Sequence, residues 1–240
     1  MISVAIVIAA CFEVPTGAND ILSIEFKPLA SPSVVVGDSL RDTLGAIQPL
    51  SITAFNYSGA EVENPPVIFT ALDRGIKVDS VTGIVSGDSA RSTARVFATV
   101  RGLSISVPIA VVLRPDTVLG ANARDSLSYS VLDSANISAP IGVKVVHATP
   151  VDTTAVPSYL VSFRILSPVD TAFAKLVTET SARSTLDTTD AGGVASRRVR
   201  IDVSRLASAV DSVIVQAFVR YRGVDVRGSP ARLVLKVKPK

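Results

Sequence analysis

The sequence has one cysteine, one histidine and no tryptophan in 240 residues. A single cysteine cannot form a disulfide within the chain, so packing alone must stabilise its domains. Transition-metal sites take several histidine and cysteine ligands, which one residue of each kind cannot supply. We therefore expect no metal and no cofactor.

Helical patterns and aromatic residues are also scarce. No stretch of about eleven residues places apolar side chains at helical spacing. Aromatic residues make up 5% of the chain, so its 48% hydrophobic content consists mainly of Val, Ala, Ile and Leu. Val and Ile favour strands, and 14 Pro and 14 Gly are spread along the chain. The composition predicts an all-β protein with many short strands.

The net charge of +3 is small and uneven: residues 12–115 carry a net −2 and residues 116–240 a net +5. A small charge with few aromatics excludes the usual nucleic-acid surfaces, and we expect no nucleic-acid partner. The excess of cations in the second half favours an acidic partner or a lipid headgroup surface.

The first residues combine a short apolar run with the only cysteine. Ile2 to Ala10 is far shorter than the about 20 residues that span a bilayer as a helix. The residues "IAAC" (Ile8 to Cys11) resemble a bacterial lipobox, which implies lipid attachment at Cys11 and a membrane-anchored protein on the periplasmic or extracytoplasmic side of the cell envelope. Residues 1–11 are then the signal, and 12–20 a tether. Such signals begin with Lys or Arg, which this run lacks, so a retained membrane-held segment and a first strand with an incidental cysteine stay open.

Alternating apolar residues indicate strands with one buried face. One such face holds Val96, Ala98 and Val100, and the next holds Ile105, Val107, Ile109 and Val111. The residues "VRGLS" predict a tight hairpin between these two strands. Pro108 indicates an edge position or a bulge, because proline cannot donate a hydrogen bond to a neighbouring strand.

Two resemblances divide the chain into domains. "VGDSL" (Val36 to Leu40), "LSITAFN" and "VDSVTGIVSG" resemble the bacterial immunoglobulin-like group-2 family, although "TALDRG" replaces its Trp-Ser-Ser-like strand. "VPSYLVSFRI", "TTDAGGVASRRV" and "DSVIVQAFV" resemble the invasin-type, group-1 family. The resemblances imply two tandem immunoglobulin-like β-sandwiches, at 21–114 and 122–240, with a linker at 115–121.

The tetrapeptide "GDSL" also marks a family of serine esterases. Ser39 would need a histidine base, but the only histidine, His147, lies in mid-chain outside that family's Asp-x-x-His motif, and no α/β pattern follows. We predict a strand-end role for His147, no catalytic residue and no enzyme activity. Asp187 and Asp190 have no calcium-loop spacing and are interpreted as an acidic turn.

Four arginines are the predicted docking patch. Arg198 and Arg200 alternate with Val199 and Ile201, and Arg220 and Arg222 alternate with Val219 and Tyr221. If the two strands are antiparallel neighbours, as the invasin-type resemblance implies, these arginines form one exposed surface. Guanidinium groups suit carboxylates and phosphates; the alternative is a solvated strand face.

The function predicted from these features is non-enzymatic. The leading hypothesis is a structural or accessory subunit of the cell envelope, docked on the extracytoplasmic face of a respiratory, photosynthetic or transport complex. Its partners are then subunits of that membrane complex, and the membrane itself through the N-terminal lipid or hydrophobic segment. The alternative is an adhesin-like or glycan- or ligand-binding surface lipoprotein.

Overall fold

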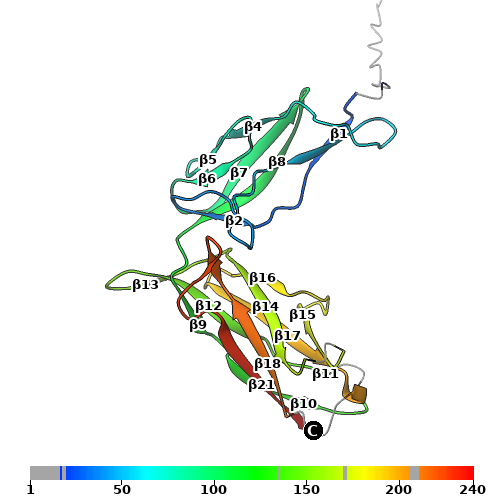
Figure 1. The fold of residues 1–240 in the computed structure, drawn as a ribbon, viewed down its shortest axis with the longest axis vertical. Helices are drawn as coiled ribbons and strands as arrows, with labels where there is room; N and C mark the ends of the chain where they lie inside the picture. The colour runs from blue at the N-terminus through cyan, green and yellow to red at the C-terminus, as the bar shows by residue number, and fades with distance from the viewer. Residues whose placement is uncertain (1–16, 18–19, 134–135, 170–171, 206–210) are drawn as a thin grey trace, which may run out of the picture.

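The computed structural model describes residues 17, 20–133, 136–169, 172–205 and 211–240, and these form two β-sandwiches arranged end to end (Figure 1). The helical element of this part of the chain is the short 3-10 helix η1 (Val203–Arg205). The all-β class and the two tandem immunoglobulin-like sandwiches are thereby confirmed. No helix within these ranges is long and apolar enough to cross a bilayer. Cys11 and the predicted signal lie outside the described residues.

The first sandwich consists of short strands around one long hairpin. Its strands are β1 (Ser23–Phe26), β2 (Ser33–Val35), β3 (Ile52–Phe55), β4 (Ile68–Ala71), β5 (Ile76–Val78), β6 (Val85–Gly87), β7 (Arg91–Val100) and β8 (Leu103–Val112). The main sheet has the order β2-β8-β7-β4, and β1 pairs with β3 and β5 with β6. Strand β2 runs parallel to β8, and the other pairs are antiparallel.

The β7–β8 hairpin confirms the sequence prediction. Its turn residues Arg101 and Gly102 have φ of 46° and 88°, the positive values that the favoured two-residue hairpin turns require. Inward residues of β7 are buried, from Ala94 to Val100. Strand β2 pairs with β8 only at Ala110–Val112, so Pro108 lies beyond it, at an edge position as predicted.

The second sandwich packs two larger sheets face to face. Its strands are β9 (Thr117–Gly120), β10 (Arg124–Tyr129), β11 (Asn136–Ile137), β12 (Ile141–Ala148), β13 (Thr153–Ala155), β14 (Leu160–Ser167), β15 (Ala174–Val177), β16 (Leu186–Thr188), β17 (Val194–Ile201), β18 (Ser212–Phe218), β19 (Arg220–Tyr221), β20 (Val224–Asp225) and β21 (Ala231–Pro239). One sheet has the order β10-β21-β18-β14-β16. The other has the order β11-β17-β12-β13, with β15 paired to β17 and β9 to β12, while β19 and β20 form a separate hairpin.

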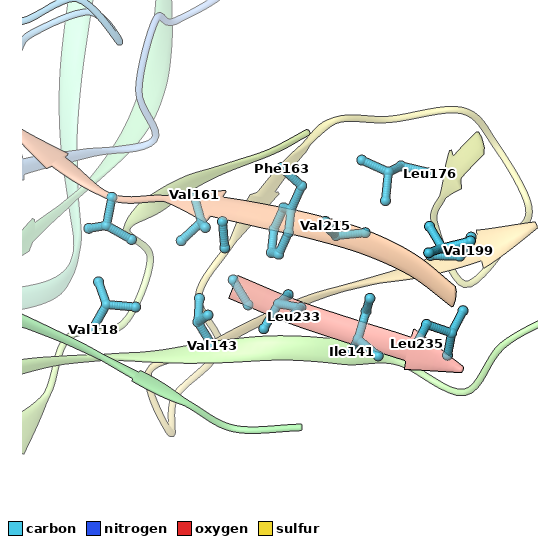
Figure 2. Close-up of a cluster of buried hydrophobic side chains, with 14 of the residues drawn as sticks. Val118, Ile141, Val143, Val161, Phe163, Leu176, Val199, Val215, Leu233 and Leu235 are labelled. Carbon is cyan, nitrogen blue, oxygen red and sulfur yellow. The ribbon is translucent and has the colours of Figure 1, made fainter. Parts of the chain in front are cut away.

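The core of the second sandwich lies between these two sheets (Figure 2). Ile141 and Val143 on β12 face side chains of the opposite sheet such as Phe163, Val215 and Leu233, and all five are nearly inaccessible to solvent. Full burial of one such aliphatic side chain contributes about 1.5–3 kcal/mol. This packing replaces the disulfide that the chain cannot form.

The predicted linker at 115–121 is wrong. Thr117–Gly120 is strand β9, which pairs antiparallel with β12 so that Val118 lies opposite Val145. Val118 is 5% exposed and belongs to the second core. Pro and Gly around this segment suggest a linker. Val118 is nevertheless buried, because the segment pairs with β12, and that pairing is not evident from the local sequence. The second sandwich therefore begins at about the end of β8.

Candidate functional site at the junction of the two sandwiches

A buried carboxylate of the first sandwich binds an arginine of the second. Asp38 lies in the turn after β2, and its side chain is only 4% exposed. Its carboxylate accepts hydrogen bonds from Nε and Nη2 of Arg41 at 2.9–3.2 Å, and from Nε of Arg222 at 2.8 Å. Arg222 is in the β19–β20 turn, 184 residues away in sequence. Two guanidinium groups thus share one buried carboxylate across the junction.

These contacts set the ionisation of Asp38. Burial alone raises the pKa of a carboxyl group, but the hydrogen bonds from Arg41, Arg222 and the backbone N–H of Ser39 outweigh burial and hold the pKa of Asp38 far below its ordinary value. The carboxylate is therefore ionised at any physiological pH. A charge buried in this way requires its partners, since an unpaired buried charge is strongly destabilising.

An apolar seam accompanies the ion pair. Val35 on β2 and Ala110 and Val112 on β8 belong by sequence to the first sandwich, yet they are part of the hydrophobic cluster of the second. The two sandwiches therefore share apolar contacts at this point. Apolar burial and the ion pair together stabilise one relative orientation of the two sandwiches.

Two glycine turns complete the contact. Gly45, with φ of 92°, and Gly223, with φ of 79°, approach so closely that a Cβ on Gly45 would lie 2.3 Å from the backbone N of Gly223. Only glycine fits this approach, and glycine adopts the positive φ without strain. Arg41 Nη1 also donates to the carbonyl of Gly45 at 2.8 Å, so the turn that contains Gly45 is also stabilised by a hydrogen bond within the first sandwich.

Aromatic rings line the same junction. The guanidinium groups of Arg222 and Arg114 lie 5.3 and 5.6 Å from the ring centroid of Tyr221, within cation–π range. The hydroxyl of Tyr159 donates to the carbonyl of Arg220 at 2.5 Å. Burial raises the pKa of Tyr159 well above its ordinary value, so the phenol stays protonated as a hydrogen-bond donor.

The only histidine supports the segment that connects the sandwiches. His147 Nδ1 lies 2.6 Å from Asp116 Oδ2 and 3.0 Å from the carbonyl oxygen of Arg114. Arg114 Nε donates to Asp116 at 2.8 Å. His147 is the second-last residue of β12, which confirms the predicted strand-end position. These groups hold residues 114–116 against the second sandwich.

The chemistry of this site is structural. A cavity of about 60 Å³ at the junction is lined by residues that include Ser33, Asp38, Tyr159 and Arg222, which leaves room for a few water molecules only. The hydroxyl of Ser33 is buried without a hydrogen-bond partner among the described residues, a position that water can satisfy. The imidazole of His147 contacts Asp116 and Arg114 rather than Ser39, so "GDSL" serves here as a turn that presents Asp38.

The acidic turn also has structural partners. Asp190 accepts hydrogen bonds from the backbone N–H groups of Gly192 and Val194. Asp187 binds Arg197 at 2.8 Å and the N–H of Ser196 at 2.7 Å. Asp190 thus stabilises its own turn, as predicted, whereas Asp187 lies in strand β16 rather than in a turn.

The predicted patch of four arginines does not form. Arg198 and Arg200 are on β17, whereas Arg220 and Arg222 belong to the β19–β20 hairpin, which follows β18 and forms a sheet of its own. Strand β18 itself lies in the sheet opposite β17. Arg198 and Arg200 do lie opposite the buried Val199 and Ile201, as predicted. Arg220 pairs with Asp225 at 2.9 Å, and Arg222 binds Asp38 in the junction.

The junction is not evident from the sequence because its members are far apart in the chain. Asp38, Arg41 and Gly45 lie in one turn region, whereas Tyr221 to Gly223 form another. The only local signals are the glycines in "DTLG" and "RYRG", which indicate tight turns. Nothing in either motif indicates that the two turns meet.

Comparisons with known proteins give remote similarities only. The sequence matches no protein-family model and no curated protein. Similar solved structures include domains 4 and 5 of the S-layer protein SbsC, at 13% identity and a TM-score of 0.33 over 91% of this chain and 99% of that one. The bacterial integrin-binding protein invasin is 12% identical, with a TM-score of 0.31, over 91% of this chain and 40% of that one. An endo-fucoidan hydrolase of glycoside hydrolase family 107 is 11% identical, with a TM-score of 0.36, over 90% of this chain and 34% of that one. These proteins differ in function and the scores are low, so the functional argument rests on the residues of this chain.

Proposed function

We propose that this protein is a non-enzymatic cell-envelope protein whose two sandwiches act as one rigid spacer. The observation that carries the proposal is the junction, where the buried carboxylate of Asp38 binds Arg222 beside the apolar seam of Val35, Ala110 and Val112. Domains joined only by a linker move independently by default. Here a buried charge pair and shared apolar packing both oppose such motion.

Rigidity suits an accessory subunit. In this proposal, Cys11 carries the lipid anchor ahead of the first sandwich, and the junction fixes where the second sandwich stands relative to that anchor. A fixed spacer can hold a docking surface at a constant position on the extracytoplasmic face of a membrane protein complex. An enzyme would instead need a cleft with reactive groups, whereas the polar groups of the junction are engaged in holding the two sandwiches together.

The test is the size of the particle that carries the protein in native membranes. We expect co-migration with a large membrane assembly after solubilisation in a mild detergent, and loss of membrane association when Cys11→Ser removes the acylation site. A free particle of one chain plus detergent would contradict the accessory-subunit role and favour the adhesin-like alternative. Unchanged membrane association of the Cys11→Ser variant would contradict the lipid anchor.

A further inference from the structure

The outer face of the β15–β17 pair collects four cations. In the strand register, Lys175 lies directly opposite Arg200, and Val177 lies opposite Arg198 on one side and Arg183 on the other. Residues that are opposite in an antiparallel pair point to the same side of the sheet. Lys175, Arg183, Arg198 and Arg200 therefore share one side, and we call them the basic face.

The alternation of burial shows that this side is the outer one at Lys175 and Arg200, whereas Val177 on the same side is buried. Ala174 and Leu176 on β15 point into the core, as do Val199 and Ile201 on β17. Their neighbours along each strand must point away from it, because successive side chains alternate between the two faces. Arg183 and Arg200 are exposed, and Lys175 and Arg198 are half-buried.

The cations of the basic face form no ion pair among the described residues, although acids lie near them. Asp202, which interacts electrostatically with Lys175, is bound to Arg205 and Ser204, and Asp133 is bound to Lys240. Glu179, which lines a hollow together with Arg198, is in no ion pair in that part of the chain. The Nε of Arg198 is buried without a hydrogen-bond partner in the described part of the chain. Like charges directly opposite in a sheet are destabilising, so this arrangement costs free energy in the isolated protein.

The opposite sheet shows the ordinary arrangement. Lys236 on β21 lies opposite Ser212 and Ser126, and Lys238 lies opposite Ser128. There, the residues opposite each lysine are neutral and polar. The basic face instead pairs Lys175 with Arg200. It borders a hollow of about 460 Å³ that is lined by these two residues and Arg183, and also by the carboxylates of Asp133 and Asp202.

We propose that the basic face binds an acidic segment of a partner protein, whose carboxylates occupy the space between Lys175, Arg183, Arg198 and Arg200. Guanidinium groups bind carboxylates through two parallel hydrogen bonds, and carboxylates would supply the missing partners. The face belongs to the second sandwich (Figure 1), whereas the predicted anchor at Cys11 precedes the first sandwich in the sequence. That position favours a protein over the anchoring membrane. The inference rests on the proposed function, for which it supplies the docking surface.

The experiment measures binding of a short synthetic peptide rich in aspartate and glutamate at low ionic strength. We expect the variant Lys175→Gln with Arg200→Gln to bind about tenfold more weakly than the natural chain, since it loses two exposed ion pairs with the peptide. The matched control, Lys236→Gln with Lys238→Gln, removes the same charge from the opposite sheet and should bind almost as well as the natural chain. Thermal unfolding of both variants verifies folding.

If both variants lose the same peptide affinity, the loss reflects net charge rather than the basic face, and the proposal is overturned. Vesicles of anionic lipid that bind through the basic face while the peptide does not would overturn it in favour of a headgroup surface. If a chain with Lys175→Gln and Arg200→Gln still co-migrates with the large assembly in native membranes, the basic face is not the docking surface, while the accessory-subunit role stands. A natural chain that never co-migrates contradicts the proposed function instead.

Discussion

The carboxylate of Asp38 in the first sandwich and the guanidinium of Arg222 in the second lie 2.8 Å apart. The aspartate is buried, whereas the arginine is half exposed, so the two partners are not equivalent. Removal of Asp38 leaves both Arg41 and Arg222 without their carboxylate. Removal of Arg222 leaves Asp38 with Arg41.

This asymmetry predicts different costs for the two substitutions. We expect Asp38→Asn to lower the free energy of unfolding by about 2–4 kcal/mol, because it breaks a buried charge network. Arg222→Gln should cost about 1 kcal/mol or less, as exposed partners do. Urea denaturation of both variants measures the difference. Equal costs would contradict the shared-carboxylate arrangement.

The pH dependence of stability follows from the same carboxylate. The folded pKa of Asp38 is depressed below the ordinary 3.8, so its contribution is fully present well above pH 3.8 and is lost as the pH falls towards the folded value. The difference in melting temperature between the natural chain and Asp38→Asn should therefore shrink below about pH 4. A difference that stays constant from neutral pH to pH 3 would show that Asp38 ionisation does not stabilise the fold.

The glycine contact makes a prediction about orientation. Gly45→Ala places a Cβ 2.3 Å from the backbone of Gly223, so the turns must separate. The control is Gly59→Ala, which has the same kind of positive φ, 78°, but nothing within 4 Å of its Cβ. We expect a cost of about 1–2 kcal/mol for Gly59→Ala from backbone strain alone, and a larger cost for Gly45→Ala. Small-angle X-ray scattering should report a changed shape only for Gly45→Ala.

The sequence predicted local structure better than long-range contacts. Alternation placed the buried faces of β7 and of the end of β17, and "VRGLS" located a hairpin, because these patterns act between neighbours in the chain. The arginine patch failed because β17 and β18 belong to opposite sheets and the chain leaves β18 before Arg220, which lies on the separate β19–β20 hairpin. Asp38 and Arg222 could not be paired from sequence, since their contact depends on how two complete sandwiches meet.

The misassigned linker gives a further prediction. Val118 on β9 is 5% exposed, whereas its neighbour Leu119 is 47% exposed. We expect Val118→Ala to lower the free energy of unfolding by about 1–3 kcal/mol through lost burial and the cavity it leaves. Leu119→Ala should change it by less than about 0.5 kcal/mol. Similar small effects for both would restore the linker interpretation.

The most direct test of the account is the distribution of distances between the two sandwiches in solution. In a Cys11→Ser background, spin labels at Lys77→Cys and Lys144→Cys span the junction, and labels at Lys144→Cys and Lys238→Cys lie within the second sandwich. A rigid spacer predicts that the distance distribution across the junction is as narrow as the one within the sandwich, and that Gly45→Ala broadens only the former. A broad distribution across the junction in the natural background would contradict the rigid spacer.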